Sequence, residues 1–207
     1  MKIAVLSKAD VHGGGASRIA HELTEGLRES GINAIHYVGW GGTRLLRDAY
    51  SKDVTPIWGK TRASRIIAKS ATLAQLAAGI PELIPYEIPF LAMSQLMEAD
   101  VVHVHDITEL LSSRSLLWLS RRKRVAWTMH DYSPLTAGCL YPFDIEPLGC
   151  RRWLFDNQTG CDKECPLRRA RGYPFGGIAN GVRILWKMKY SLAKEGKFDI
   201  VTPSSWL

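Results

Sequence analysis

The sequence lacks any apolar run of the roughly 20 residues that a membrane-spanning helix needs. Its first apolar run, residues 3–6, is too short for the core of a secretory signal peptide, and Lys8 and Asp10 follow it closely. Internal repeats and low-complexity linkers are missing as well. We therefore expect a globular protein in the cytoplasm, without a membrane-spanning helix.

Cysteine and acidic residues are both scarce. There are four cysteines among 207 residues, and in a cytoplasmic protein we expect them to be reduced rather than bridged. Acidic residues number 20 against 27 lysines and arginines, which gives a net charge of +7. This excess indicates an anionic partner, and nucleic acid, a nucleotide-sugar or an acidic membrane surface would each fit.

Two short runs, residues 101–105 and 125–129, are rich in β-branched and aromatic residues and have no alternating polar face. This is typical of parallel strands that are covered on both sides. Residues 109–120 between them predict a helix, and the basic run 121–124 suits the negative end of its dipole. The two strands are followed by His105-Asp106 and His130-Asp131. Both pairs should therefore lie at the carboxyl edge of the sheet, where open α/β sheets bind ligands.

The N-terminal residues predict a strand over 2–7, a loop, a helix over 16–30 and a strand over 33–38, which together form a βαβ unit. Ile19, Leu23 and Leu27 share one face of this helix, and Gly31 ends it. The loop holds Gly13, Gly14 and Gly15, which let a backbone approach a phosphate beside the positive end of the helix. Arg18 stands where the dinucleotide-binding fingerprint has its third glycine, and the P-loop lysine is missing, so a tight turn without a ligand is the open alternative.

Residues 39–59 predict an irregular polar segment, and a helix over 61–79 carries Arg62, Arg65 and Lys69 on one side. Three Ile-Pro pairs follow within residues 80–89 and argue against a regular helix there. An apolar, proline-broken stretch beside a basic helix can lie against a membrane interface. Packing as a cover on the sheet is the alternative interpretation, and both can hold together.

The cysteines all fall in an irregular segment rich in proline and glycine, predicted as an insertion over residues 133–176. They are Cys139, Cys150, Cys161 and Cys165. The spacing of the last two is within the range of zinc sites, and a structural zinc would give this segment a core. Free buried thiols and two disulfides are the alternatives. After the insertion we expect a helix over 180–195, a strand over 198–202 and the start of another helix, which predicts that a longer protein continues beyond Leu207.

Taken in order, these motifs resemble family 4 glycosyltransferases. The resemblance is carried by residues 2–6, by His12 to Ala16, by residues 100–106, and by residues 127–139 and 200–207, and it covers most of the chain except 39–96. A bacterial subgroup that builds extracellular polysaccharides shares the cysteine-rich insertion. The resemblance implies a Rossmann-like, doubly wound and mainly parallel sheet, as the N-terminal, acceptor-side domain of the two-domain GT-B fold. Residues 1–207 would be that domain, without the C-terminal donor-binding domain.

The implied reaction is the transfer of a sugar, with retention, from a nucleotide-sugar to a glycan or lipid-linked acceptor, without a metal in the chemistry. By the resemblance, His130 and Asp131 are the catalytic pair, and Gly13 to Gly15 face the donor diphosphate and the acceptor. His105 and Asp106 line the acceptor side. Because the family's paired glutamates are missing, we expect the chain alone to be inactive, and a peripheral role at the inner membrane surface for the whole enzyme.

Two other functions are weighed against this one. The first is a Rossmann-like module that binds a nucleotide or glycan without turnover. The second is a nucleic-acid-binding domain with a zinc element, which the net charge of +7 and the cysteines suggest. Against the second, the basic residues are scattered and no aromatic stacking platform accompanies them, so no nucleic-acid partner is expected.

Overall fold

The computed structural model describes residues 1–40, 53–58, 61–78, 82, 84–105, 107, 110–137 and 181–203. Within these ranges one six-stranded sheet has the order β3-β2-β1-β4-β5-β6, and every neighbouring pair is parallel. The strands are β1 (Lys2–Ala9), β2 (Asn33–Trp40), β3 (Val54–Pro56), β4 (Val101–Val104), β5 (Arg124–Thr128) and β6 (Phe198–Val201). The predicted Rossmann-like α/β sheet is thus confirmed.

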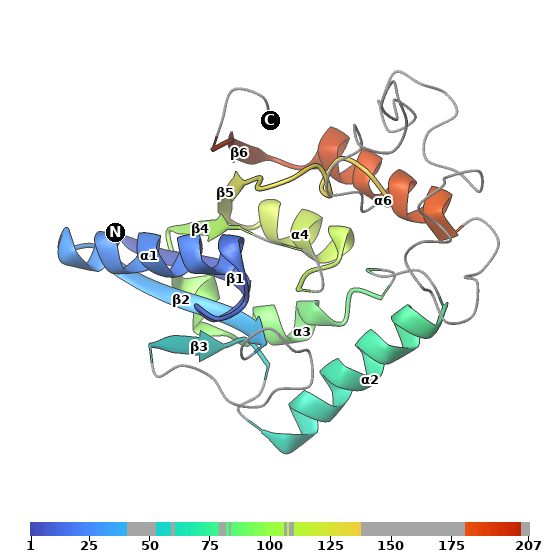
Figure 1. Ribbon diagram of the computed structural model, residues 1–207, viewed down its shortest axis with the longest axis horizontal. Helices are drawn as coiled ribbons and strands as arrows, with labels where there is room; N and C mark the ends of the chain where they lie inside the picture. Colours follow the sequence, from blue (N-terminus) through green and yellow to red (C-terminus); the bar gives the residue numbers. More distant parts are fainter. Residues whose placement is uncertain are drawn as a thin grey trace.

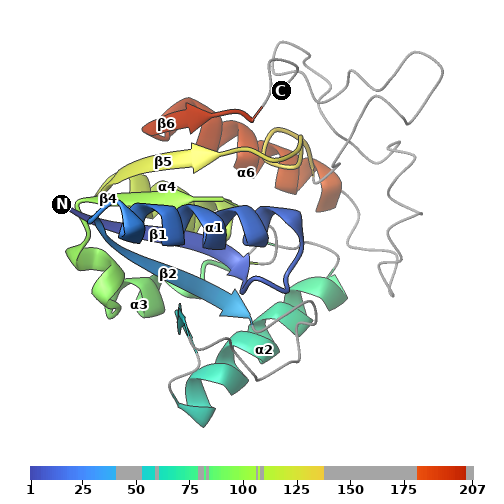
Figure 2. The same cartoon turned by 60° about the vertical axis from the view of Figure 1, so that its left-hand side comes forward.

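Helices cover both faces of the sheet (Figures 1 and 2). They are α1 (Gly15–Glu29), α2 (Arg62–Ala78), α3 (Glu87–Ala92), the short 3-10 helix η1 (Gln95–Glu98), α4 (Ser113–Ser120) and α6 (Gly181–Glu195). Helix α1 lies on one face, and α3, α4 and α6 lie on the other. The chain winds from β1 outward to β3 and then restarts at β4 in the opposite direction. Right-handed crossovers in opposite directions place their helices on opposite faces.

The central strands are apolar and fully covered, as parallel strands between two helical layers must be. Ala4, Val5 and Leu6 of β1 and Val102 and Val104 of β4 have no exposed surface. The main core lies on the α4 side, where Leu116 and Leu119 are also fully buried. Since each buried side chain of this size contributes about 1.5–3 kcal/mol, these strands hold the carboxyl edge of the sheet in a fixed position.

Helix α1 packs through small residues rather than through the predicted apolar stripe. Its buried residues are Ser17, Ala20 and Thr24, whereas Ile19 is 47% exposed. The Thr24 hydroxyl donates to the Ala20 carbonyl within the helix at 2.8 Å, so its burial leaves no polar atom unsatisfied. Small side chains let the helix approach β1 and β2 closely. The expectation that Ile19 belongs to the core face was therefore wrong, although Gly31 ends the helix as predicted, with a φ of 77°.

Three other local predictions need correction. Strand β3 lies inside the segment predicted as irregular; its three residues pair with β2 at the edge of the sheet, where Pro56 is tolerated. Helix α3 includes Pro89, which fits because the first turn of a helix needs no N–H partner. Helix α4 begins at Ser113 rather than at residue 109, because Ser112 caps it by accepting from the Ser115 N–H at 3.1 Å.

Among the described residues, none of the helices combines the length and the apolar character that crossing a bilayer requires.

Candidate functional site

The candidate site lies at the carboxyl edge, where the strand order reverses between β1 and β4. The glycine loop follows β1 and leads into α1, His105 directly follows β4, and His130 follows β5 with one residue between. In Figure 2 these strands end on the same side of the sheet, where α1 also begins. Ligands of open α/β sheets bind at such a reversal. The fold therefore brings the predicted glycine loop and both predicted histidines to one edge.

The glycine loop is a tight turn that ends on an uncapped helix. The Gly13 N–H donates to the Asp10 carbonyl at 2.8 Å, and a Cβ atom on Gly13 would lie 2.3 Å from the Cβ of Ala9. Gly14 has a φ of 112°, which L side chains rarely adopt, and around Gly15 nothing lies within 4 Å of a built Cβ. Within the described chain, the first turn of α1 has no side-chain cap and no acidic residue. The helix thus presents its positive end without a side-chain cap, next to the open space at Gly15.

His105 and His130 form a hydrogen-bonded pair. Nδ1 of His105 lies 3.0 Å from Nε2 of His130, and the two rings are stacked with centroids 5.3 Å apart. His105 is buried, at 2% exposure, while His130 is half-buried. Burial lowers the pKa of His105, and the neighbouring His103, His130 and His36 add to this effect, so that the pKa is about 3. His105 is therefore neutral at physiological pH.

This geometry restricts where the pair can carry protons. A hydrogen bond between two ring nitrogens holds a single hydrogen, so both rings cannot be fully protonated while it is formed. Because His105 stays neutral, any positive charge on the pair resides on His130. Among the described residues, Nε2 of His105 is also one of the few buried polar side-chain atoms without a hydrogen-bond partner. Such an atom is a feature that folded proteins usually avoid and that functional sites retain.

The other predicted site residues are placed as follows. Asp131 accepts from the Ser133 N–H at 2.6 Å, so its carboxylate closes the turn after β5. His103, which lies within β4, is bonded through Nε2 to the Thr128 hydroxyl of the neighbouring strand β5 at 2.8 Å. Asp106 and the four cysteines, Cys139, Cys150, Cys161 and Cys165, lie outside the described residues. In the described part of the chain there is no group of three or more side chains suited to hold a metal ion.

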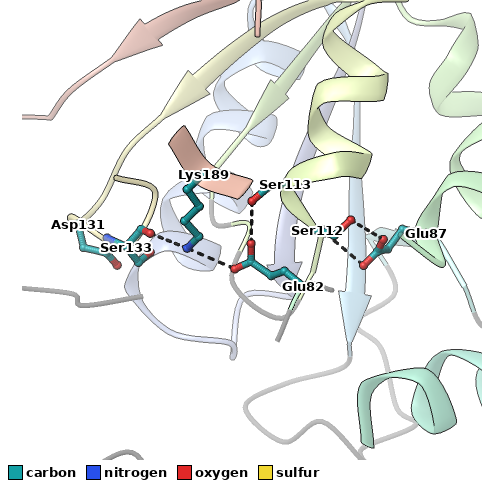
Figure 3. Close-up of polar contacts among 7 residues, drawn as sticks. All are labelled: Glu82, Glu87, Ser112, Ser113, Asp131, Ser133 and Lys189. Carbon is teal, nitrogen blue, oxygen red and sulfur yellow. Dashed lines mark hydrogen bonds and ion pairs between the residues drawn. The ribbon is translucent and has the colours of Figure 1, made fainter. Parts of the chain in front are cut away.

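Three buried charged residues near this edge were not predicted. They are Lys189 of α6 and Glu82 and Glu87 around α3, which are drawn in Figure 3. All three are less than 9% exposed. The burial of Lys189 could have been predicted, because Lys189 lies on the same side of the helix as the apolar Leu185 and Leu192, and the apolar side of a helix faces the core. The two glutamates lie among isoleucines and prolines, a pattern without a clear period, so only the tertiary structure identifies them.

Glu87 sits against the N-terminus of α4. Its carboxylate accepts from the Ser115 hydroxyl at 2.6 Å and from the Ser112 N–H at 3.2 Å. These bonds favour the charged form, but burial opposes it more strongly and raises the pKa of Glu87 to about 7. The group is therefore titrated within the physiological range, although it lies in the interior.

In the parent, the free energy of unfolding should depend on pH through Glu87, and we expect the Glu87→Gln variant to lose this dependence. An unfolded glutamate releases its proton near its ordinary pKa of 4.5, whereas folded Glu87 keeps it until about 7. The stability contributed by Glu87 is therefore complete below 4.5 and falls as pH rises to 7, by about 3 kcal/mol. Urea unfolding at several pH values measures this as the difference between parent and variant.

The control for this prediction is Glu22→Gln in α1, where the side chain is 54% exposed and paired with Arg18. The lowered pKa values of His36 and His105 reduce stability only as pH falls below about 6.5, and this effect cancels between parent and variant. A parent and a Glu87→Gln variant with parallel stability curves from pH 4.5 to pH 8 would contradict the prediction.

Comparisons with known proteins supply no relative from which a role could be transferred. No family model, no curated protein and no solved structure matches the chain. The resemblance to family 4 glycosyltransferases therefore depends on the order and spacing of the motifs. The six-stranded sheet by itself identifies a Rossmann-like α/β fold, which hosts many functions. The case for a function has to be made from the carboxyl edge.

Proposed function

We propose that this chain is the N-terminal, acceptor-binding half of a retaining glycosyltransferase. In this proposal the enzyme transfers a sugar from a nucleotide-sugar to a glycan or lipid-linked acceptor. The observation that carries it is the meeting of three features at the strand reversal: the glycine loop, the buried His105, and His130 bonded to it at 3.0 Å. A phosphate-accepting loop beside a hydrogen-bonding histidine is the combination that transfer from a sugar diphosphate needs.

Each element has a role in the proposed reaction. The uncapped start of α1 attracts the diphosphate, and Gly14 and Gly15 let it approach the backbone. His130 donates a hydrogen bond to the donor sugar or to the departing diphosphate as negative charge develops there. His105, neutral and buried, fixes the ring of His130 and lines the acceptor side. Asp131 shapes the turn that carries His130, by its bond to the Ser133 N–H.

The remaining donor contacts would come from a C-terminal domain, as in the resembling family. We therefore expect the 207-residue chain to show no turnover with a panel of nucleotide-sugars. The product of the longest open reading frame that begins at the same Met1, here called the longest encoded chain, should transfer the sugar with retention of the anomeric configuration. Turnover by the short chain alone would contradict this division. Tight nucleotide or glycan binding without turnover by either chain would favour the non-catalytic binding module instead.

We also propose a peripheral position at an anionic membrane, with α2 as the contacting element. Ile66, Ile67 and Leu73 of α2 are 54–55% exposed, and Arg62 is exposed at the start of the helix. The sequence of α2 contains no acidic residue. The four cysteines keep their proposed role as ligands of a structural zinc in the insertion.

Two alanine substitutions separate a ligand-binding loop from a mere tight turn. A methyl group on Gly15 enters open space, so Gly15→Ala should fold with unchanged or slightly higher stability. If a diphosphate sits there, the same methyl should raise the KM for the nucleotide-sugar about tenfold or more, equivalent to about 1.4 kcal/mol. Steady-state kinetics of the longest encoded chain, with thermal unfolding of each variant, measures both effects.

Gly26→Ala is the matched control, because Gly26 lies in the same helix and a Cβ there also meets nothing within 4 Å. Gly13→Ala is the opposite case: its methyl would overlap Ala9 and come within 2.9 Å of the Ser17 hydroxyl. This overpacking should lower the free energy of unfolding by about 1–3 kcal/mol. If Gly15→Ala behaves like Gly26→Ala in the kinetics, the loop is only a turn and the proposed role of the loop fails.

A further inference from the structure

Lys189 is a lysine in the hydrophobic interior. It belongs to α6, has 1% exposure, and shares its helical stripe with the buried Leu185 and Leu192. Its ammonium group donates to the Ser133 carbonyl at 2.6 Å and lies 3.3 Å from a carboxylate oxygen of Glu82. Burying an ammonium group is unfavourable unless it is paired in this way. An apolar residue would pack equally well beside the leucines, so packing alone does not account for a lysine.

Glu82 anchors the other end of this ion pair. Its second carboxylate oxygen accepts from the hydroxyl of Ser113, the first residue of α4, at 3.0 Å (Figure 3). Glu82 also has a φ of 68°, a left-handed conformation that is unfavourable for any residue with a Cβ. A strained backbone persists where surrounding contacts over-determine it. The connection between α2 and α3 is thus held to α4 and α6 by one side chain.

Through Ser133, the contacts of Lys189 and Glu82 extend to residues 131–133, the turn that follows His130 of the candidate site. The Ser133 N–H donates to Asp131 at 2.6 Å, and the Ser133 carbonyl accepts from Lys189. Both backbone polar groups of Ser133 are therefore engaged, one from within the turn and one from α6. Ala137, four residues further along the chain, belongs to an apolar cluster with Leu185 and Trp186 of α6. His130 lies directly before this doubly held turn, and its Nε2 meets His105 at 3.0 Å.

We propose that Lys189, paired with Glu82, is a positioning residue for His130. By holding the Ser133 carbonyl, it orients the turn 131–133 so that the His130 ring meets His105 in the buried arrangement described above. The consequence for catalysis rests on the proposed glycosyltransferase function, whereas the placement of the ring does not. Lys189 touches no reacting group in this proposal; it acts only through the turn.

The main variant of the test removes the ion pair without leaving a single buried charge, whereas the second variant leaves Glu82 buried without its cation. The main variant is Lys189→Met/Glu82→Gln, because Met fills the volume and Gln keeps an oxygen for Ser113; Lys189→Met alone is the second variant. The control is Lys187→Met, on the exposed side of the same helix. Ring-nitrogen NMR signals of the six histidines in the 207-residue chain are followed across a pH titration. The signals of His105 and His130 are assigned with His105→Gln and His130→Gln.

We expect the double variant to fold while the signals of His105 and His130 shift or broaden and those of His12 and His21 stay in place. Lys187→Met should leave all six unchanged. In the longest encoded chain, the double variant should lower kcat about tenfold with the KM for the nucleotide-sugar nearly unchanged.

Two outcomes overturn the proposal. One is a folded double variant whose His105 and His130 signals match those of the parent. The other is failure of both variants to fold, because Lys189 would then be needed for the fold itself. Shifted histidine signals together with an inactive parent enzyme would refute the glycosyltransferase function and leave the positioning role standing, so the two failures are distinguishable.

Discussion

Replacing His130 with alanine is expected to lower kcat by about 10²–10³-fold, the usual cost of removing one donor that stabilises developing charge. The expectation follows from the hydrogen bond to His105, which fixes the ring at the carboxyl edge. In the proposed reaction the donor acts on the departing diphosphate, so its loss should change kcat far more than KM. Steady-state kinetics with a nucleotide-sugar accepted by the longest encoded chain measures the effect. His130→Gln, which keeps an N–H donor, should recover part of the rate.

A change in rate has to be separated from a change in stability. Removing His130 leaves Nδ1 of the buried His105 without its partner, which should cost about 1–3 kcal/mol of folding free energy. His103→Ala is the matched control, because it breaks a 2.8 Å bond to Thr128 in the adjacent part of the sheet. It should destabilise the protein comparably and leave kcat per folded molecule within about threefold, which corresponds to about 0.7 kcal/mol of barrier. A His130→Ala enzyme that behaves like His103→Ala would remove His130 from the mechanism.

The carboxyl-edge site was predictable from sequence because two simple rules act there together. Continuous apolar runs identified β1, β4 and β5, and parallel pairing places the residues after each strand at one edge. His105 and His130 therefore had to lie near each other once their strands were neighbours in the sheet. The hydrogen bond between them did not follow, because it depends on side-chain rotamers and on the turn after β5.

The helix faces were less predictable, because periodicity reports where apolar residues recur and not which face is covered. In α1 the covered face consists of Ser17, Ala20 and Thr24, whose small size permits close packing on the sheet. The branched Ile19 points to solvent instead. The burial of Lys189 was missed as well, although this residue lies on the same side of α6 as the buried Leu185 and Leu192.

In helix α2, as in α1, polar side chains face the protein and branched apolar side chains face outward. Its buried side chains include Thr72, which contacts the Tyr86 hydroxyl at 3.1 Å, and Gln75, which accepts from the Ile84 N–H at 2.8 Å. Polar groups thus hold the helix to the residues around α3, while Ile66 and Ile67 face outward at 55% exposure. A helix that directs hydrogen-bonding residues inward and branched apolar residues outward is suited to a second surface. The net charge of +7 and the lack of acidic residues in α2 favour an anionic one.

The three basic residues of α2 do not contribute equally to this surface. Arg62 is exposed, whereas Arg65 and Lys69 are only partly exposed and make contacts within the protein. At an anionic leaflet an exposed basic residue can contribute roughly 1 kcal/mol. The exposed apolar side chains should therefore contribute more to membrane binding than the basic ones. Each apolar side chain can add about 1 kcal/mol or more when its exposed part is buried in the interface.

We therefore expect the Ile66→Ser/Ile67→Ser/Leu73→Ser variant to lose membrane binding by at least about 10²-fold, since three lost insertions sum to roughly 3 kcal/mol. The change affects exposed side chains and should leave folding intact. Liposome flotation with anionic vesicles measures the partitioning. Binding by the parent should fall as salt rises, through screening of Arg62 and the partly exposed cations. Arg62→Glu/Arg65→Glu/Lys69→Glu should weaken binding at low salt and make it insensitive to salt.

Ile19→Ser is the matched control, because this isoleucine of α1 is similarly exposed, at 47%, but lies on a different helix. It should float like the parent, which would show that the loss is specific to α2 and does not follow from lower surface hydrophobicity in general. If the α2 serine variant floats as well as the parent, α2 covers the sheet without contacting a membrane. Binding to neutral and anionic vesicles alike would remove the role of charge and leave insertion of the apolar side chains as the sole attraction, because headgroup charge acts only through the basic residues.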